Sequence, residues 1–218
     1  MNGRDFPKEN NRLSSVLVAL GVILIAAAAG LTVFNLNQSN EAGKAAAQTV
    51  SELREAIGAD ETARRDESAG SGAQQETQLP DYKLNPEMEM PVVRIGYRDY
   101  IGTLSIPALG LELPVISSWD YSALRVAPCR YTGSAYMDDM VIAAHNYASH
   151  FGRLRELSPG DSVVFTDMDG NVFDYVVADL EILDPYDIDR MTAGGWALTL
   201  FTCTPGGQQR VTLRCDRA

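Results

Sequence analysis

The sequence predicts an all-β domain that follows a single membrane-spanning helix. An uncharged, apolar run occupies 13–34, and from about residue 82 short apolar runs alternate with Gly, Pro and Asp at close intervals. Roughly 20 apolar residues suffice to cross a bilayer as a helix, and short runs bounded by turn residues are typical of β-strands. We therefore expect four parts: a cytoplasmic N-terminus (1–12), a transmembrane signal anchor (13–36), a helical and flexible spacer (37–81) and one folded domain (82–218).

The apolar run at 13–34 has two interpretations. Three basic residues precede it and the AAAAG stretch resembles a small-residue cleavage site, as in a secretory signal peptide. Signal peptides usually have shorter apolar cores, so a retained anchor is favoured. Lys44 and Arg54 follow the run and partly offset the basic residues before it, so the charge bias towards a cytoplasmic N-terminus is mild. Either interpretation places the folded domain outside the cytoplasm, on a single-pass protein of the cell membrane if the anchor is kept.

Composition excludes several classes of function. The formal net charge of -11 argues against nucleic acid as a partner, because phosphate-binding surfaces need clustered Lys and Arg. The three cysteines are too few for a disulfide framework and show no C-x-x-C spacing. We expect no metal and no cofactor.

The segment between the span and the domain changes character along its length. Helix formers dominate 41–57, so the helix should continue briefly beyond the membrane. Residues 58–80 lack aromatic side chains and are rich in Gly, Ala, Ser and acidic residues, the composition of a flexible spacer.

The domain should consist of short strands. Apolar and alternating runs predict strands at 101–106, 112–116, 140–145, 162–167, 172–183, 197–203 and 210–215, and a short helix at 151–157.

A hairpin should join the fourth and fifth strands. Asp169-Gly170 is a strong turn signal between alternating residues. The start of a calcium-binding loop is imitated by Asp167, Asp169 and Asn171. The twelfth position of such a loop is a glutamate, but here it is Ala178. A turn explains these residues better than a cation site.

Three residues at strand ends are candidates for chemistry. A thiol becomes a nucleophile when a nearby base or cation favours its thiolate. Cys203 ends one predicted strand, His145 ends another, and Arg210 begins the strand after Cys203. Each also has a plainer interpretation, since most free cysteines are small buried hydrophobes. His150, in a polar loop, is expected to be solvated.

The order of these residues resembles the sortase family, the cysteine transpeptidases of Gram-positive-type bacteria. The string TLFTC at 199–203 matches the family's TLxTC strand, and Arg210 follows in the next strand. The AHN string at 144–146 and FGRL at 151–154 are similar to the family's GHN and FxxL segments, and 101–115 resembles its opening strands. The likeness covers about 95–217. The TCTP and RVTLR strings are similar to pilin-polymerising class C members and HNYASHFGRL to classes B or D, so the class stays open.

The resemblance implies a fold and a set of roles. The fold is a closed β-barrel of about eight strands with short helices. Cys203 is implied as the nucleophile, His145 as its proton partner and Arg210 as the cationic stabiliser. Thr202, Thr204 and Asn146 are implied as substrate-binding or oxyanion residues. Asn146 could also orient His145 or simply end the strand.

The resemblance also implies the partners of the reaction. Secreted proteins bearing an LPxTG-like sorting motif would be the substrates, and an amine of a cell-wall precursor or a pilin lysine would be the acceptor. No Asp-Pro-aromatic plug precedes residue 100, and the loop from Cys203 to Arg210 is short. An open, unlidded cleft is therefore expected, with Asp184-Pro185-Tyr186 forming a turn.

Other interpretations stay open from the residues alone. A cell-wall cysteine hydrolase or cross-linking transpeptidase also uses Cys and His, although its usual SHGC-like string is missing from the sequence. A non-catalytic, wall-proximal binding module would bury Cys203. Cys129 and Cys215 are a candidate disulfide in an extracellular domain.

Overall fold

The computed structural model of the chain describes residues 10–70 and 79–218. Helices of the described residues are α1 (Asn10–Gly70), α2 (Asp81–Leu84), α3 (Ile188–Met191) and the 3₁₀ turns η1 (Pro107–Leu109) and η2 (Leu154–Glu156). The strands are β1 (Val93–Ile95), β2 (Arg98–Ile106), β3 (Leu111–Ile116), β4 (Cys129–Thr132), β5 (Met140–Ala143), β6 (Ser162–Asp167), β7 (Val172–Leu183), β8 (Leu198–Cys203) and β9 (Arg210–Arg217).

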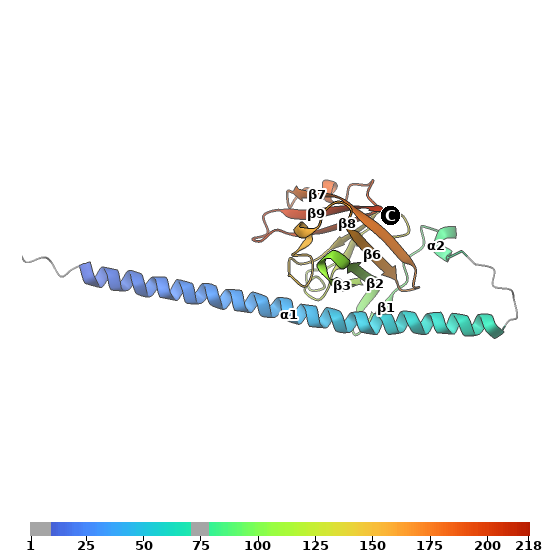
Figure 1. Cartoon of the computed structure of the whole chain (residues 1–218), viewed down its shortest axis with the longest axis horizontal. Coiled ribbons are helices and arrows are strands. Elements are labelled where there is room, and N and C mark those ends of the chain that lie inside the picture. Colours follow the sequence, from blue (N-terminus) through green and yellow to red (C-terminus); the bar gives the residue numbers. More distant parts are fainter. Residues whose placement is uncertain (1–9, 71–78) are drawn as a thin grey trace, which may run out of the picture. The chain divides into compact units, whose positions relative to one another are not determined.

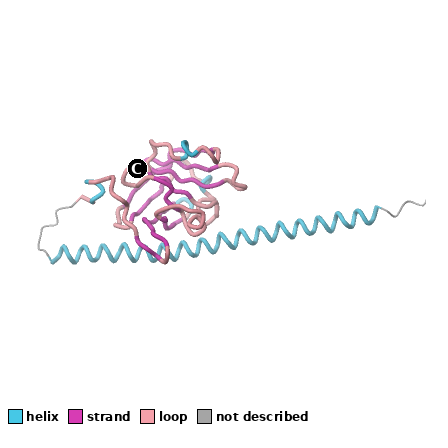
Figure 2. Tube along the Cα trace, turned by 180° about the vertical axis from the view of Figure 1, so that it is seen from behind, coloured by secondary structure: helices cyan, strands magenta, loops and turns pink. Residues whose placement is uncertain are grey.

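The strands close into a barrel, seen as the wrapped arrows of Figure 1 and the magenta tube of Figure 2. Their order is β1-β2-β3-β4-β5-β8-β9-β7-β6, and an additional pairing of β6 with β2 closes the ring. β3–β4 and β5–β8 are parallel, and the other pairs are antiparallel. Eight strands therefore form the barrel, while β1 only extends the edge of β2. The expected closed barrel of about eight strands is confirmed.

All seven predicted strands are present, with ends shifted by a few residues at most. β6 and β7 match their predicted ranges. Two strands, β1 and β4, were not predicted, and they are only three and four residues long. In the segment predicted as a helix at 151–157 the structure has the 3₁₀ turn η2.

The hairpin between β6 and β7 folds around one buried carboxylate. Asp167 is fully buried and accepts hydrogen bonds from the backbone N–H groups of Asp169 (2.9 Å) and Asn171 (2.8 Å) and from the Tyr136 hydroxyl (2.7 Å). Gly170 adopts a φ of 81°, a left-handed conformation that glycine enters without steric cost. The turn interpretation of this segment is confirmed, and it accounts for the acidic residues without a cation.

The first part of α1 is apolar enough to cross a membrane. A candidate span lies within Ser14–Ala59, its most apolar stretch has a mean hydropathy of 2.7, and none of that stretch is buried inside the protein. An exposed helix that is apolar on all sides suits a lipid environment.

The second part of α1 packs against the barrel instead of forming a free spacer. Ala42, Ala46, Val50 and Leu53 are buried, and their spacing of three or four residues places them on one face of the helix. Ala46 joins the barrel core, and Leu53 joins a second cluster. The backbone stays helical to Gly70, whereas the composition predicted a flexible spacer from residue 58. The remaining expected spacer residues at 71–78 lie outside the described residues.

Leu53 anchors this contact and gives a first prediction. Its side chain is fully buried among Tyr100, Ile116 and neighbouring apolar residues of the second cluster. Leu53→Ala should lower the free energy of unfolding of the barrel by about 2–3 kcal/mol, because it removes buried methyl groups and leaves a cavity. Urea unfolding of the full chain in detergent, followed by tryptophan fluorescence, measures this loss. Glu55→Ala, at an exposed position of the same helix, is the control, and equal stability of the two variants would show that the helix does not support the barrel.

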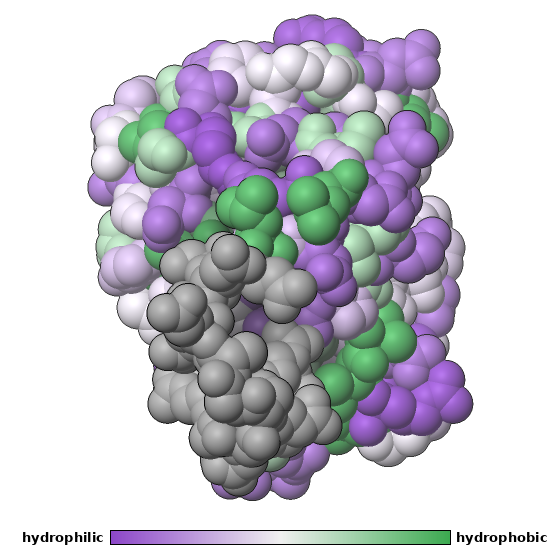
Figure 3. All heavy atoms as spheres, turned by 90° about the vertical axis from the view of Figure 1, so that its right-hand side faces the viewer, coloured by the Kyte–Doolittle hydropathy of each residue, from purple (hydrophilic) through white to green (hydrophobic). Residues whose placement is uncertain are grey.

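Polar side chains make up much of the coloured surface on one face of the molecule. On the coloured part of the face in Figure 3, hydrophilic side chains surround several groups of hydrophobic ones. This matches the net charge of -11 and places most apolar side chains of the domain in its interior.

Candidate active site

Cys203 and Arg210 face each other at the loop end of the β8–β9 hairpin. They are Cα partners in the antiparallel ladder, so their Cβ atoms lie about 4.5–5.5 Å apart. The connecting loop is tightly closed: the Thr204 N–H donates to the Gln209 carbonyl (2.9 Å), and the Gln209 N–H donates to the Thr204 hydroxyl (3.1 Å). Thr204 therefore fixes the turn that brings the thiol and the guanidinium together.

His145 reaches the same end of the barrel from the neighbouring strand. β5 runs parallel to β8, and the Ala144 N–H donates to the Phe201 carbonyl (3.1 Å) beyond the last ladder pair. The buried Thr202 hydroxyl donates to the Ala144 carbonyl (2.8 Å). These two bonds join the residue before His145 to the residues before Cys203, so Thr202 acts as a link between the two strands.

The loop after His145 folds back beneath it. The Phe151 N–H donates to the His145 carbonyl (3.2 Å), and a Cβ at position 152 would come within 2.5 Å of the Asn146 carbonyl oxygen. Only glycine fits at Gly152, which explains the FGRL string in physical terms. Asn146 itself is exposed and is not among the residues that line the pocket described below.

His150 is buried, and the expectation that it is solvated is wrong. Its side chain is fully buried, and neither ring nitrogen has a hydrogen-bond partner among the described residues. Tyr147 lies between the two histidines, with ring centroids 5.0 Å from His145 and 5.5 Å from His150. The polar composition of the loop hid this burial, because composition does not report a loop that folds back on itself.

A pocket of about 240 Å³ joins the three candidate residues. His145, Cys203 and Arg210 lie at its base, together with Ala143, Ala144, Phe201 and Thr202. One wall comes from the segment before and within β4, and it consists of Trp119, Tyr121, Leu124 and Tyr131. The opposite wall comes from the β7–β8 connection, and it consists of Pro185, Ile188 and Met191.

The two walls give the pocket sides that the short loop alone did not predict. The loop between Cys203 and Arg210 is short, but other segments supply the sides of the pocket. Trp119 stacks on Tyr131 (centroids 5.2 Å apart), and Tyr131 meets Phe201 edge-on (5.4 Å). None of these wall residues could be predicted as functional, because no local motif marks them.

The expected turn at Asp184-Pro185-Tyr186 is confirmed. The Tyr186 N–H donates to the Asp184 carboxylate (2.9 Å), and the Asp187 N–H donates to the Asp184 carbonyl (3.1 Å). Pro185 of this turn lines the pocket, while Tyr186 points into solvent.

Comparison with known proteins decides the family. The family model described as "Sortase domain" matches residues 104–218, more than half of the chain and nearly all of the barrel. The chain belongs to the sortase family. It is therefore a cysteine transpeptidase of the sortase type, and the resemblance seen in the sequence is confirmed. No curated protein matches the sequence.

Solved sortases share the fold of this sortase at low sequence identity. Sortase C1 of Streptococcus agalactiae is 16% identical with a TM-score of 0.56, covering 78% of this chain and 98% of that one. The sortase D5 transpeptidase of Clostridium perfringens is 17% identical with a TM-score of 0.54, covering 80% and 99%. Sortase C of Streptococcus pneumoniae is 22% identical with a TM-score of 0.54, covering 78% and 96%.

Burial shapes the protonation of the sortase's histidines and cysteines. Desolvation, and secondarily the charge of Arg125, lower the pKa of His145. Burial raises the pKa of both Cys129 and Cys215 to about 12. Cys203, by contrast, is partly exposed, so it is the accessible one of the chain's three thiols.

The candidate disulfide between Cys129 and Cys215 is absent. Both residues are free, and they belong to two different core clusters. Cys129 lies in the second cluster with Leu53, and Cys215 lies in the barrel core. In the sheet, β5 and β8 lie between β4 and β9, so the Cα atoms of the two residues are at least about 14 Å apart, beyond the reach of a disulfide.

The described residues hold no group of three or more His, Cys, Asp or Glu side chains that could bind a metal ion. The pocket therefore offers a thiol, an imidazole and a guanidinium as its reactive groups.

His150 gives a prediction about stability and pH. Burial, and secondarily the charge of His145, lower the pKa of His150 from 6.5 to about 4. The unfolded chain therefore takes up a proton near pH 6.5 and the folded chain only near pH 4, so stability is complete above pH 6.5 and declines as the pH falls to 4. This single group should remove about 3 kcal/mol of stability across that window.

His150→Leu should flatten this decline, since the ring nitrogens make no hydrogen bond that leucine would lose. Chemical unfolding at a series of pH values between 4 and 7 measures the slope for each variant. Arg155→Gln, at an exposed position nearby, should keep the wild-type slope. A His150→Leu slope equal to that of wild type would mean that His150 titrates normally in the folded protein.

Proposed function

We propose that this sortase cuts a C-terminal, LPxTG-like sorting motif and transfers the protein to an amine, with Cys203 as nucleophile. The arrangement of Cys203 opposite Arg210, in one pocket with His145, is the observation that carries the proposal. A neighbouring cation and imidazole favour the thiolate form of a cysteine, which is the nucleophilic form.

In the first half-reaction, the Cys203 thiolate attacks the carbonyl carbon of the motif's threonine. The carbonyl oxygen becomes an oxyanion, which the Arg210 guanidinium stabilises with its permanent charge and fixed N–H donors. The C–N bond then breaks, His145 as imidazolium donates a proton to the departing amine, and a thioester to Cys203 remains. Because burial lowers the pKa of His145, only part of the enzyme carries this proton at neutral pH.

In the second half-reaction, an acceptor amine attacks the thioester carbonyl. His145, now neutral, takes the proton of the amine, and the Cys203 thiolate leaves. One amide bond is exchanged for another, with no need for ATP. The acceptor would be an amine of a cell-wall precursor or a pilin lysine.

Thr202, Thr204 and Asn146 have supporting parts in this proposal. Thr202 holds the strand before His145, and Thr204 closes the turn between Cys203 and Arg210. The backbone N–H groups beside Cys203 would complete the oxyanion site. Asn146, exposed at the start of its loop, is the least supported of the three.

The apolar part of α1 would anchor the enzyme in the cell membrane, with the N-terminus in the cytoplasm and the barrel outside. Its length, hydropathy and exposure support the anchor, and the mild excess of basic residues before the span supports the orientation. Protease added to intact cells should then degrade the barrel. If the barrel survives until the cells are lysed, the orientation is the opposite one.

The function is tested with the full chain in detergent micelles. LPxTG-like and NPxTN-like peptides are incubated with either an oligoglycine amine or a lysine-bearing pilin-like peptide, and products are identified by mass spectrometry. A product joining the peptide's threonine to the amine, with an acyl adduct on the Cys203 tryptic peptide, supports the proposal and shows which acceptor is used. Release of only the free acid would indicate a hydrolase, and no product with an unreactive Cys203 would indicate a binding module.

A further inference from the structure

Arg214 is buried on the outer face of the barrel, where an arginine would ordinarily reach solvent. Val211, Leu213 and Cys215 of β9 belong to the barrel core, so the residues that alternate with them point outwards. Arg210 and Arg214 therefore share the outer face, yet Arg214 is only 1% exposed. The segment that covers it is the connection between β7 and β8, which contains α3.

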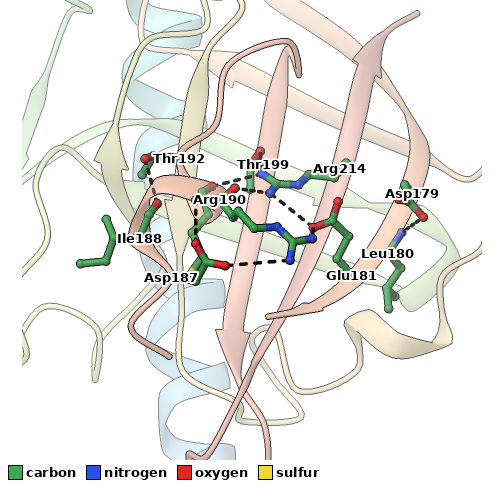
Figure 4. A network of polar contacts seen from close by, with 10 residues as sticks. Asp179, Leu180, Glu181, Asp187, Ile188, Arg190, Thr192, Thr199 and Arg214 are labelled. Atoms are coloured by element: carbon green, nitrogen blue, oxygen red, sulfur yellow. Dashed lines mark hydrogen bonds and ion pairs between the residues drawn. The ribbon is translucent and has the colours of Figure 1, made fainter. Parts of the chain in front are cut away.

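The guanidinium of Arg214 holds this connection by its backbone, as Figure 4 shows. It donates to the Met191 carbonyl (3.1 Å), to the Arg190 carbonyl and to the Thr199 hydroxyl (3.0 Å) of β8. The Glu181 carboxylate of β7 lies 3.7 Å from the same group. One side chain thus ties α3 to three strands of the barrel.

α3 depends on such a tie because it is a single helical turn. Isolated helices this short are unstable in water, and the carbonyls at their C-terminal end lack helical partners. The Asp187 carboxylate caps the N-terminal end by accepting from the Arg190 N–H (3.2 Å). Arg214 donates hydrogen bonds to the carbonyls at the C-terminal end, where a cation also interacts favourably with the helix dipole.

α3 is also a wall of the pocket that contains Cys203. Ile188 and Met191 line it opposite the aromatic wall, and Met191 is the residue whose carbonyl Arg214 binds. The position of this wall therefore follows the position of the guanidinium. Arg214 itself does not line the pocket.

We propose that Arg214, supported by Glu181, is a positioning residue that holds α3 in place as the wall that binds the sorting peptide. This rests on the proposed function, in which the pocket takes the peptide. Substrate affinity should then depend on Arg214, whereas the chemistry at Cys203 should not.

The test compares the wild-type full chain with Arg214→Met, which keeps a long apolar stem but removes every donor. Hydrogen exchange of the Met191 and Thr192 amides, which close the helical turn, should accelerate at least about tenfold, while exchange in β8 stays unchanged. KM for the sorting peptide should rise about tenfold with kcat changed less than about threefold. The rate at which iodoacetamide alkylates Cys203 should stay within about twofold of wild type.

Three further variants separate positioning from general destabilisation. Glu181→Gln keeps the shape of the partner and should give the same changes at smaller size, which covers the case in which Arg214→Met does not fold. Val177→Ala weakens the barrel core away from the pocket and should leave KM unchanged. Arg190→Ala removes the ion pairs of its side chain with Glu181 (3.3 Å) and Asp187 (3.9 Å) but keeps the carbonyl that Arg214 binds, so it should raise KM less than Arg214→Met does.

Two results would overturn the proposal. Unchanged exchange in α3 would show that Arg214 does not hold the turn, and faster exchange with an unchanged KM would show that α3 does not bind the peptide. If the wild-type enzyme transfers no peptide at all, the proposed function fails instead, and the exchange measurement still decides whether Arg214 holds α3.

Discussion

Replacing Cys203 with alanine is expected to lower peptide transfer by at least about 10⁴-fold, because no other group of the pocket can form the thioester. Partly exposed Cys203 opposes Arg210 at the end of the β8–β9 hairpin. The acyl adduct should disappear together with the transfer product. Steady-state assays with intact-mass detection of the adduct measure both.

Cys215→Ala is the matched control for this variant. Cys215 lies on the neighbouring strand but is fully buried, and burial raises the pKa of its thiol to about 12. Its loss should cost only about 1 kcal/mol of stability, as for a small cavity, and should leave kcat/KM within about twofold. Native alkylation should likewise modify Cys203 alone. Full transfer by Cys203→Ala would show that Cys203 is not the nucleophile.

Arg210→Lys is expected to lower kcat/KM on the order of 100-fold while the barrel stays folded. The Arg210 Nη1 donates to the carbonyls of Gly207 (3.1 Å) and Gln209 (3.2 Å), and among the described residues no bond involves Nη2 or Nε. The loop carbonyls thus hold one edge of the guanidinium, and the rest can meet the oxyanion. Lysine keeps the charge but cannot do both, because it lacks the rigid fork of donors.

The loss should appear mainly in kcat, since the oxyanion exists only in the transition state and the tetrahedral intermediate. Arg155→Lys, at an exposed position of η2, is the control and should keep at least about half of wild-type activity. Circular dichroism melting should place both variants within about 2 °C of wild type, because neither change removes core packing. Near wild-type turnover by Arg210→Lys would show that the guanidinium of Arg210 does not stabilise the oxyanion.

Much of the barrel could be predicted because strand patterns are local. β6 and β7 match their expected ranges, since alternation and the Asp169-Gly170 turn both lie within a short stretch of sequence. β4 was missed because its four residues include only one strongly apolar side chain pointing inwards. Its strand conformation depends on pairing with β5 and β3, which no local pattern reports.

The base of the pocket was also foreseeable, whereas its walls were not. Cys203, His145 and Arg210 stand at strand ends within strings that resemble the family, and the structure gathers them in one pocket. Trp119 and Met191 come from connections whose position depends on tertiary contacts, such as the guanidinium of Arg214. A pattern of spacing cannot show which distant carbonyl an arginine will bind.

The packing of α1 on the barrel was missed for a related reason. The stretch 41–57 was recognised as helical, but Ala42 and Ala46 are too small to give a marked apolar stripe. Small residues let a helix approach the barrel closely, and the barrel surface determines whether it does. A helical prediction therefore did not extend to a buried face.

The placement of the three cysteines has a consequence for damage by peroxide. Leu198, not Cys203, is the residue of β8 paired with Cys215, so the two sulfur-bearing residues lie about 16 Å apart along the sheet and on opposite faces. Cys129 is sealed in another cluster. A sulfenic acid formed at Cys203 would find no second thiol of its own chain with which to condense, so its recovery would depend on a reductant supplied by another molecule.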